Sequence, residues 1–295
     1  MILLTLQKKN LIHPPPWLMS NTHMLTMMGS VAYGASSDTS DVDLYGWCIP
    51  PKDMVFPHLS GEILGFGKQK KRFEQYQEHH ITDESSSKQY DITVYSIVKY
   101  FQLCMDNNPN MIDSLFVPRN CILHMSAIGQ MVREKRRLFL HKGAYFKFKG
   151  YAYSQLHKMR GKNPSGNRVE IREKYGYDVK FAYHLIRLLY ECQQILEEGD
   201  INLQKNREHL KAIRRGEVPQ EDIIRWFQSK EEALEKLYST STLQHSPDES
   251  KIKQLLVDCL EHAYGNLSNC VVVPDKATST IKQIKEIIEN FEKIS

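Results

Sequence analysis

The 295-residue sequence predicts an α+β fold, in which a small mixed sheet is followed by an all-helical region. Apolar, strand-like runs occur at 24–29 and 41–49, and strand-like alternation returns at 73–81 and 88–95. From about residue 122 onward, apolar residues recur at helical spacing. We therefore expect an extended lead-in at 1–23, a mixed-sheet core at 24–120 and a helical domain at 121–295.

The composition narrows the class of protein. Hydrophobic residues make up 41% of the chain and charged residues 25%, which is ordinary for a globular protein with a core. No apolar run reaches the roughly 18 residues that a membrane span needs, and the six cysteines show no Cys-x-x-Cys spacing. We expect a cytoplasmic protein with reduced thiols and no membrane partner. The net charge of +4 is too small to indicate nucleic-acid binding by itself.

The lead-in contains three consecutive prolines at 14–16, which favour an extended backbone. Trp17 and Leu18 follow and can anchor the segment to the core. We interpret it as a spacer and not as a proline-recognition motif, because the sequence has no second proline-rich stretch.

The first two strands frame the most informative segment. The first strand stops at Gly29-Ser30, and the second begins at Asp41, with Asp43 two residues later. Residues two apart on a strand point to one face, so these two carboxylates would repel each other unless a cation lies between them. Hard oxygen ligands of this kind favour Mg²⁺ or Mn²⁺. The pattern therefore predicts a metal site at the start of the second strand.

Gly29 and Ser30 predict the phosphate-binding part of the same site. Glycine lets the backbone approach a phosphate closely, and Ser30 with the N–H groups after it can hold the phosphate at the start of a helical turn. A phosphate cradle followed by paired carboxylates is the chemistry of a nucleotidyltransferase, which binds a nucleoside triphosphate (NTP) through a divalent cation.

The third strand-like run carries His79 and His80 next to each other. Consecutive residues of a regular strand face opposite sides. We therefore do not expect the two imidazoles to share a metal ion.

A third carboxylate is expected on a strand beside the second one. Asp91 is the best candidate, because it lies in the first half of the run at 88–95, which precedes a predicted helix. Glu74 and Glu78 on the preceding strand remain alternatives.

Helical spacing predicts the remaining elements. Ser96 leads into one helix, and Asn108-Pro109 ends it and starts another. Further helices are expected at 122–139, 143–160, 177–198, 203–215, 220–239, 248–264 and 275–293.

Lys180, His184 and Arg187 fall on one face of the predicted helix at 177–198, at positions i, i+4 and i+7. Two cations and an imidazole in a row suit a triphosphate or an RNA backbone. A solvated polar face is the alternative interpretation of the same spacing.

These motifs together resemble the polymerase-beta-type nucleotidyltransferase superfamily. Within it the chain is similar to a branch of bacterial and phage nucleotidyltransferases, RlaP-like, some of them associated with RNA-repair pathways. One departure is Asp113, where that branch tends to carry a glutamate. The likeness covers about residues 24–216 and rests on the segments 29–34, 40–43, 90–96, 108–116, 149–156 and 177–187.

The resemblance implies the site residues in more detail. Asp41, Asp43 and Asp91 would be the catalytic residues and would hold two Mg²⁺ or Mn²⁺ ions, with Asp91 as general base. The nucleotide-binding residues would be Gly29, Ser30, Tyr33, Gly34, Ser40, Ser154, Lys180, His184 and Arg187.

We therefore expect a metal-dependent enzyme that transfers a nucleoside monophosphate from an NTP, such as ATP, to a hydroxyl acceptor. An RNA 3′ end is the favoured acceptor, since it agrees with the family association and with the basic residues Lys147, Lys149, Lys158, Arg160, Lys162 and Arg168. A protein hydroxyl, as in toxin–antitoxin systems, and a small molecule are the alternative acceptors. A degenerate nucleotide-binding module is the non-enzymatic alternative.

Overall fold

The computed structural model describes residues 2–35, 41–63, 65–67, 69, 71–161, 168–265, 267 and 284. Within these residues it contains a five-stranded mixed sheet, which confirms the predicted α+β class. The sheet order is β3-β4-β2-β1-β5, with β2 and β4 parallel and the other neighbours antiparallel. The strands are β1 (Thr22–Met27), β2 (Val42–Cys48), β3 (Gln75–Asp83), β4 (Lys88–Ser96) and β5 (Ile122–Met125).

The parallel pairing of β2 and β4 sets the register that matters for function. Asp43 is the direct Cα partner of Asp91, and the two strands remain in register from there to their ends. Strand residues two apart share a face, so Tyr45 lies on the same face as both aspartates. This is the face toward which the large helices pack.

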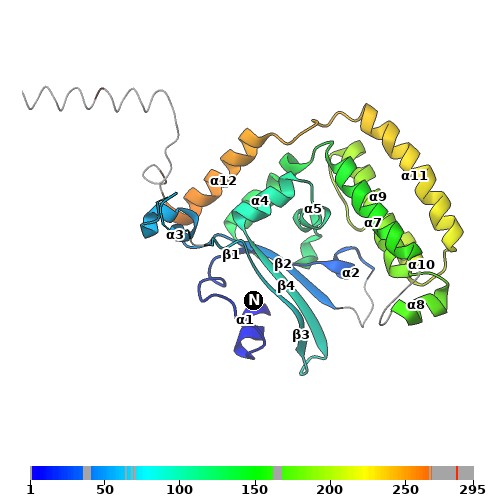
Figure 1. Cartoon of the computed structure of the whole chain (residues 1–295), viewed down its shortest axis with the longest axis horizontal. Coiled ribbons are helices and arrows are strands. Elements are labelled where there is room, and N and C mark those ends of the chain that lie inside the picture. The colour runs from blue at the N-terminus through cyan, green and yellow to red at the C-terminus, as the bar shows by residue number, and fades with distance from the viewer. Residues whose placement is uncertain are drawn as a thin grey trace, which may run out of the picture.

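A short helix covers the other face of the sheet. α1 (Ile2–Lys8) buries Leu3 and Leu6 against Leu44 and Ile92, and it lies across the sheet from α4 and α5 in Figure 1. The prediction of an extended lead-in at 1–23 is therefore wrong for this helix. Its two buried leucines are three residues apart, the spacing at which one helix face meets an apolar surface.

The opposite face carries α4 (Ile97–Met105), α5 (Pro109–Phe116), α7 (Ala144–Arg160) and α9 (Val179–Glu198) (Figure 1). Side chains cap three of these helices at the N-terminus, since Ser96, Asn108 and Asp178 each accept N–H groups of the first turn. α7 and α9 form the most extensive helix pair of the described chain.

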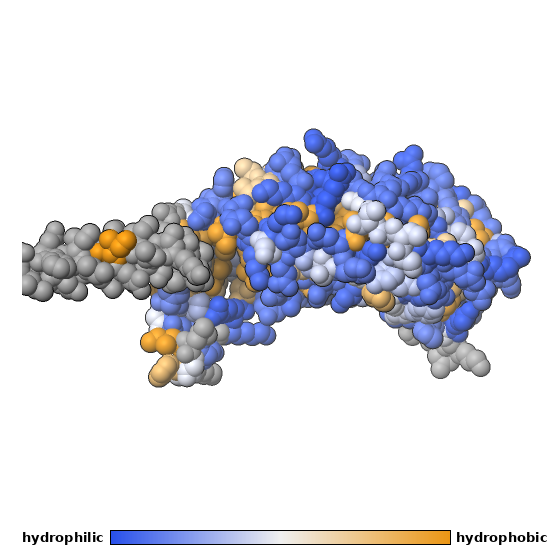
Figure 2. Space-filling model, turned by 90° about the horizontal axis from the view of Figure 1, so that it is seen from above, coloured by the Kyte–Doolittle hydropathy of each residue, from blue (hydrophilic) through white to orange (hydrophobic). Residues whose placement is uncertain are grey.

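The remaining helices surround this pair or return to the sheet. None of the described helices combines the length and the apolar composition that a membrane crossing requires, and the surface seen in Figure 2 is largely hydrophilic, with apolar residues showing in narrow seams. The remaining helices are α2 (Gly29–Ala32), α3 (Lys52–Val55), α6 (Ala127–Glu134), α8 (Arg168–Tyr175), α10 (Arg207–Arg214), α11 (Gln220–Thr240) and α12 (Glu249–Tyr264), with 3₁₀ turns η1 (Pro57–Ser60), η2 (Arg119–Cys121) and η3 (Arg136–Phe139).

The boundary between sheet and helices differs from the expected one. The segment 122–139, predicted as one helix, contains β5, α6 and η3, so the last strand follows the expected boundary at residue 120. α12 packs on α4 and α6, and Tyr264 donates a hydrogen bond to the carbonyl of Pro50. The last described helix, α12, is thus joined to the segment that follows β2. The helix predicted at 275–293 lies outside the described residues apart from Ile284.

The pH dependence of stability tests the packing of His23 on β1. Its ring stacks on Trp47, and burial, with His124 nearby, lowers the pKa of His23 to about 4. An unfolded chain would protonate this histidine near pH 6.5, so the unfolded state binds more protons between pH 6.5 and 4. We expect the free energy of unfolding to fall by about 1–2 kcal/mol over that interval, after allowing for partial exposure.

Urea unfolding across this pH range measures the effect. His23→Gln should flatten the profile between pH 6.5 and 4, whereas His262→Gln, at an exposed position of α12, should keep the wild-type slope. Equal slopes for the wild-type protein and His23→Gln would contradict the buried, neutral imidazole.

Candidate active site

The turn at Gly29 lies directly on the Asp43 carboxylate. The N–H of Met28 donates to the carbonyl of Asp43 at 2.8 Å, which fixes the end of β1 against the start of β2. Gly29 has φ +63°, and a Cβ built on it would lie 2.0 Å from Asp43 Oδ2. Any other residue would strain the backbone and displace the carboxylate. The close approach that was expected toward a phosphate is therefore made toward Asp43.

Three carboxylates share this end of β2 and β4. Asp41 is exposed, Asp43 is half-buried, and the Asp91 side chain is 26% exposed. Burial raises the pKa of Asp43, and the negative charges of Asp91 and Asp41 raise it as well, against the opposite influence of Lys180 and His79. The electrostatic environment of Asp43 is therefore one that favours an added positive charge.

The three carboxylates are not pre-assembled as a metal centre. Among the residues that the structure describes, no group of three or more acidic, histidine or cysteine side chains is arranged to hold a metal ion. Asp91 Oδ1 instead accepts the main-chain N–H of His80 at 2.7 Å. The donor chemistry nevertheless fits Mg²⁺ or Mn²⁺, because all three groups are hard oxygen ligands and a cation would offset their mutual repulsion.

The alternative third carboxylates are held elsewhere. Glu78 accepts the N–H of His13 at 3.0 Å. Glu74 lies 3.8 Å from Lys99, at the end of the β3–β4 hairpin remote from Asp91. The β2–β4 register thus favours Asp91 over both glutamates as the neighbour of Asp43.

His79 and His80 depart from the expected strand geometry. The register of β3 against β4 shifts between Glu78 and Ile81, so both histidines oppose Asp91. Their Nδ1 atoms lie 3.4 and 4.0 Å from Asp91 Oδ1. The prediction that they face opposite sides is wrong, because it assumed a regular strand and the strand contains a bulge.

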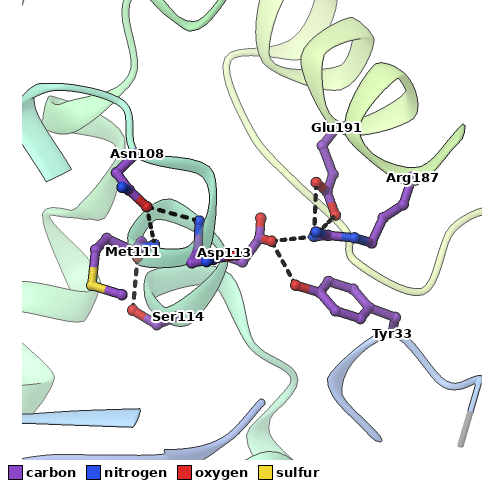
Figure 3. A network of polar contacts seen from close by, with 8 residues as sticks. Tyr33, Asn108, Met111, Asp113, Ser114, Arg187 and Glu191 are labelled. Atoms are coloured by element: carbon purple, nitrogen blue, oxygen red, sulfur yellow. Dashed lines mark hydrogen bonds and ion pairs between the residues drawn. The ribbon is translucent and has the colours of Figure 1, made fainter. Parts of the chain in front are cut away.

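A buried polar network joins Tyr33, four residues after Gly29, to Asp113, Arg187 and Glu191 (Figure 3). The Tyr33 hydroxyl donates to Asp113 Oδ2 at 2.6 Å, and Arg187 forms an ion pair with the same oxygen. Arg187 Nη1 also lies 3.0 and 3.1 Å from the two oxygens of Glu191, and its guanidinium carbon lies 4.2 Å from the centre of the Tyr33 ring. The network joins the turn after β1 to α5 and α9.

The charges of this network do not cancel if both acids are ionised, since one guanidinium faces two carboxyl groups. Burial raises the pKa of Asp113, and it raises the pKa of Glu191 well above its usual range. Asp113 Oδ1 and Arg187 Nε have no hydrogen-bond partner within the described protein. A single guanidinium is therefore the only charge in the cluster that offsets the two buried carboxyl groups.

Arg187 does not lie in the exposed row that its spacing predicted. It is only 5% exposed, and its charge is used by Asp113 and Glu191, so it supports the turn and is not a free ligand for phosphate. The i, i+4 spacing of Arg187 and Glu191 was the available sequence signal for this ion pair. Asp113, whose role the family pattern left open, is the centre of the network.

The other predicted nucleotide-binding residues occupy varied positions. Lys180 is exposed in the first turn of α9, within electrostatic reach of Asp43, while His184 is half-buried and packs edge-on against its neighbour Tyr183. Ser154 is exposed on α7, and Gly34 has φ +65°. Ser40 lies outside the described residues.

Two residues far along the chain hold the same turn and carry no local sequence signal. Gln204 Nε2 donates to the carbonyl of Ala32 at 3.2 Å, and Arg214 Nη1 donates to the carbonyl of Ala35 at 2.5 Å. The last carbonyls of the turn therefore depend on the segment that contains α10.

Tyrosines continue the face that carries the aspartates. Burial, with Tyr95 as the next contribution, raises the pKa of Tyr45 to about 12, and Asp43 and Asp91 act in the same direction. Tyr151 of α7, 41% exposed, exerts a weaker influence of the same kind on Tyr95.

Comparison with known proteins gives one family match and a distant structural neighbour. A family model described as RlaP, RNA repair pathway DNA polymerase beta family, matches residues 21–258. No curated protein matches the chain. Among solved structures, a nucleotidyltransferase-like protein from Exiguobacterium sibiricum 255-15, with a crystal structure at 1.90 Å resolution, is 12% identical over 88% of this chain and 71% of its own, with a TM-score of 0.29.

Removal of the buried cation tests the network. Arg187→Met leaves Asp113 and Glu191 without a counter-charge, and breaking a buried ion pair in this way typically costs about 3–5 kcal/mol. We expect a loss of that size in the free energy of unfolding, measured by urea denaturation. Lys180→Met, at an exposed position of the same helix, should change stability by no more than about 0.5 kcal/mol. A loss below about 1 kcal/mol for Arg187→Met would show that the network is not structurally important.

Proposed function

Because the chain belongs to the RNA repair pathway DNA polymerase beta family, we propose that it transfers a nucleoside monophosphate from an NTP to the 3′-hydroxyl of an RNA, with Mg²⁺ or Mn²⁺ as cofactor. The observation that carries the proposal is the pairing of Asp43 with Asp91 across two parallel strands, directly beneath the Gly29 turn. The proposed metal ligands would then lie next to a sharp, glycine-dependent turn, and this arrangement supports nucleotidyl transfer.

The roles of the residues follow from their positions. Asp41, Asp43 and Asp91 would hold the metal ions, which neutralise charge on the triphosphate and make the acceptor hydroxyl easier to deprotonate. Gly29 and Ser30 would contact the β- and γ-phosphates through main-chain and hydroxyl donors. Lys180, exposed at the start of α9, would add positive charge beside the transferred group.

The reaction itself is a displacement at the α-phosphorus. The acceptor oxygen forms a bond to that phosphorus, the bond to the bridging oxygen of the β-phosphate breaks, and pyrophosphate leaves. Asp91 is the proposed acceptor of the hydroxyl proton, because its carboxylate lies beside Asp43 and retains 26% exposure.

Exposed basic residues support an RNA acceptor. Lys147, Lys158 and Arg160 are exposed on α7, and Lys158 Nζ lies 5.9 Å from the ring centre of Phe181, next to Lys180. Lys149 is excluded from this set, since its ammonium group forms an ion pair of 2.7 Å with Glu231. The remaining basic residues of the predicted set, Lys162 and the side chain of Arg168, lie outside the described residues.

An acceptor assay tests the proposed reaction. The protein, Mg²⁺ or Mn²⁺ and each NTP labelled at the α-phosphorus are incubated with RNA that ends in a 3′-hydroxyl, with the same RNA blocked at its 3′ end, and without RNA. We expect label only on the open RNA, and Asp43→Asn should reduce it to background without loss of stability, because the substitution removes one of three repelling charges. Label on a polypeptide or on a small molecule would replace RNA as the acceptor. No transfer to any acceptor would overturn the proposed enzyme.

The contact between Gly29 and Asp43 gives a second prediction. Gly29→Ala places a methyl group where Asp43 Oδ2 now lies, so it should displace this carboxylate and abolish transfer, and positive φ adds about 1–2 kcal/mol of destabilisation. Gly61→Ala is the matched control, because Gly61 also has positive φ but its Cβ would meet no atom within 4 Å. It should lose similar stability and keep transfer activity. An active Gly29→Ala protein would contradict the assigned role of Asp43.

A further inference from the structure

The bulge in β3 is centred on the proposed third metal ligand. Two residues of β3, His79 and His80, stand opposite the single residue Asp91 of β4. Bulges of this kind bend the strand and redirect a side chain, and they often lie next to active sites. Here the redirected residues, His79 and His80, face Asp91, which is the register partner of Asp43.

His80 adopts a backbone conformation that is uncommon for residues other than glycine. Its φ is +55°, in the left-handed region, which disfavours residues with a Cβ. This conformation turns the His80 N–H toward Asp91 Oδ1, to which it donates at 2.7 Å. The His80 side chain is 80% exposed, so its packing does not explain the conformation. Residues with a strained backbone persist where the surrounding structure imposes that conformation, and they occur most often at functional sites.

His79 acts on the same oxygen from the other residue of the bulge. Its Nδ1 lies 3.4 Å from Asp91 Oδ1, and its side chain is 47% exposed. A main-chain N–H and a ring nitrogen thus both contact Asp91 Oδ1. Neither of these two contacts involves Oδ2.

We propose that the bulge at His79–His80 is a positioning device that orients Asp91 so that its carboxylate can share a divalent cation with Asp43. This role rests on the proposed function, and it depends on the main-chain conformation at residue 80, whose N–H donates to Asp91. The requirement falls on the φ angle of that residue and not on its imidazole. Removing a hydrogen-bond donor to a metal ligand typically weakens metal binding by about 10–100-fold.

Mn²⁺ binding, followed by the electron paramagnetic resonance signal of the free ion, tests the proposal without reference to turnover. His80→Gly, which adopts positive φ freely, should bind Mn²⁺ within about twofold of the wild-type protein. His80→Val, whose branched side chain opposes positive φ, should bind about 10–100-fold more weakly. If the valine variant does not fold, His80→Ala tests the same conformation with a smaller side chain.

The Asp91→Ala background separates positioning from a general effect on the fold. Without the carboxylate the bulge has nothing to orient, so His80→Gly and His80→Val should bind Mn²⁺ equally there. Equal affinities of the two variants in the wild-type background would overturn the inference and leave the proposed function intact. A wild-type protein that binds no Mn²⁺ would overturn both the metal assignment and this inference.

Discussion

The buried charge of Arg187 is the interaction on which the geometry of the candidate active site depends. A guanidinium removed from water is strongly unfavourable unless it is paired, and here Asp113 and Glu191 supply the pairing at the junction of α5 and α9. Tyr33 joins through its hydroxyl and its ring, so the turn that carries Gly29 is attached to the helical region by a polar contact with strict geometry. Apolar packing alone would allow this turn more freedom to shift against α9.

On the side of the turn that faces Asp43, the main constraint is the repulsion among the carboxylates. Asp43 is half-buried, close to Asp91 and Asp41, and pressed against the main chain of Gly29. The parallel pairing of β2 and β4 holds these groups together. Its hydrogen bonds join main-chain groups and do not depend on the charges of the side chains. The sheet and the buried network therefore fix two opposite sides of the same short turn.

Much of this arrangement could be predicted from the sequence, because it is encoded locally. The glycine that ends β1, the two aspartates on one face of β2 and the caps at Ser96 and Asn108 each follow from residue type and short spacing. The helix α1, the strand β5 and the bulge at His79–His80 could not be predicted in this way. The helix and the strand are decided by partners far along the chain, and the bulge is decided by its pairing with the next strand. A period of two or of 3.6 residues reveals none of these partners. The buried position of Arg187 could not be predicted either, because helical spacing does not reveal that Asp113 of another helix lies opposite it.

The two carbonyl contacts made by Gln204 and Arg214 have a consequence for the order of folding. The sequence separation is 172 positions in one contact and 179 in the other. The turn near the start of the chain therefore receives these hydrogen bonds from a segment that is synthesised much later. Contacts of such long range close slowly, and domains that need them can be assembled only after the distant segment has emerged from the ribosome. A nascent chain that ends before residue 204 already carries Asp41, Asp43 and Asp91, but its turn lacks these two donors. Competence for nucleotide chemistry would then be acquired late in synthesis, which limits the lifetime of partly folded chains able to act on nucleotides.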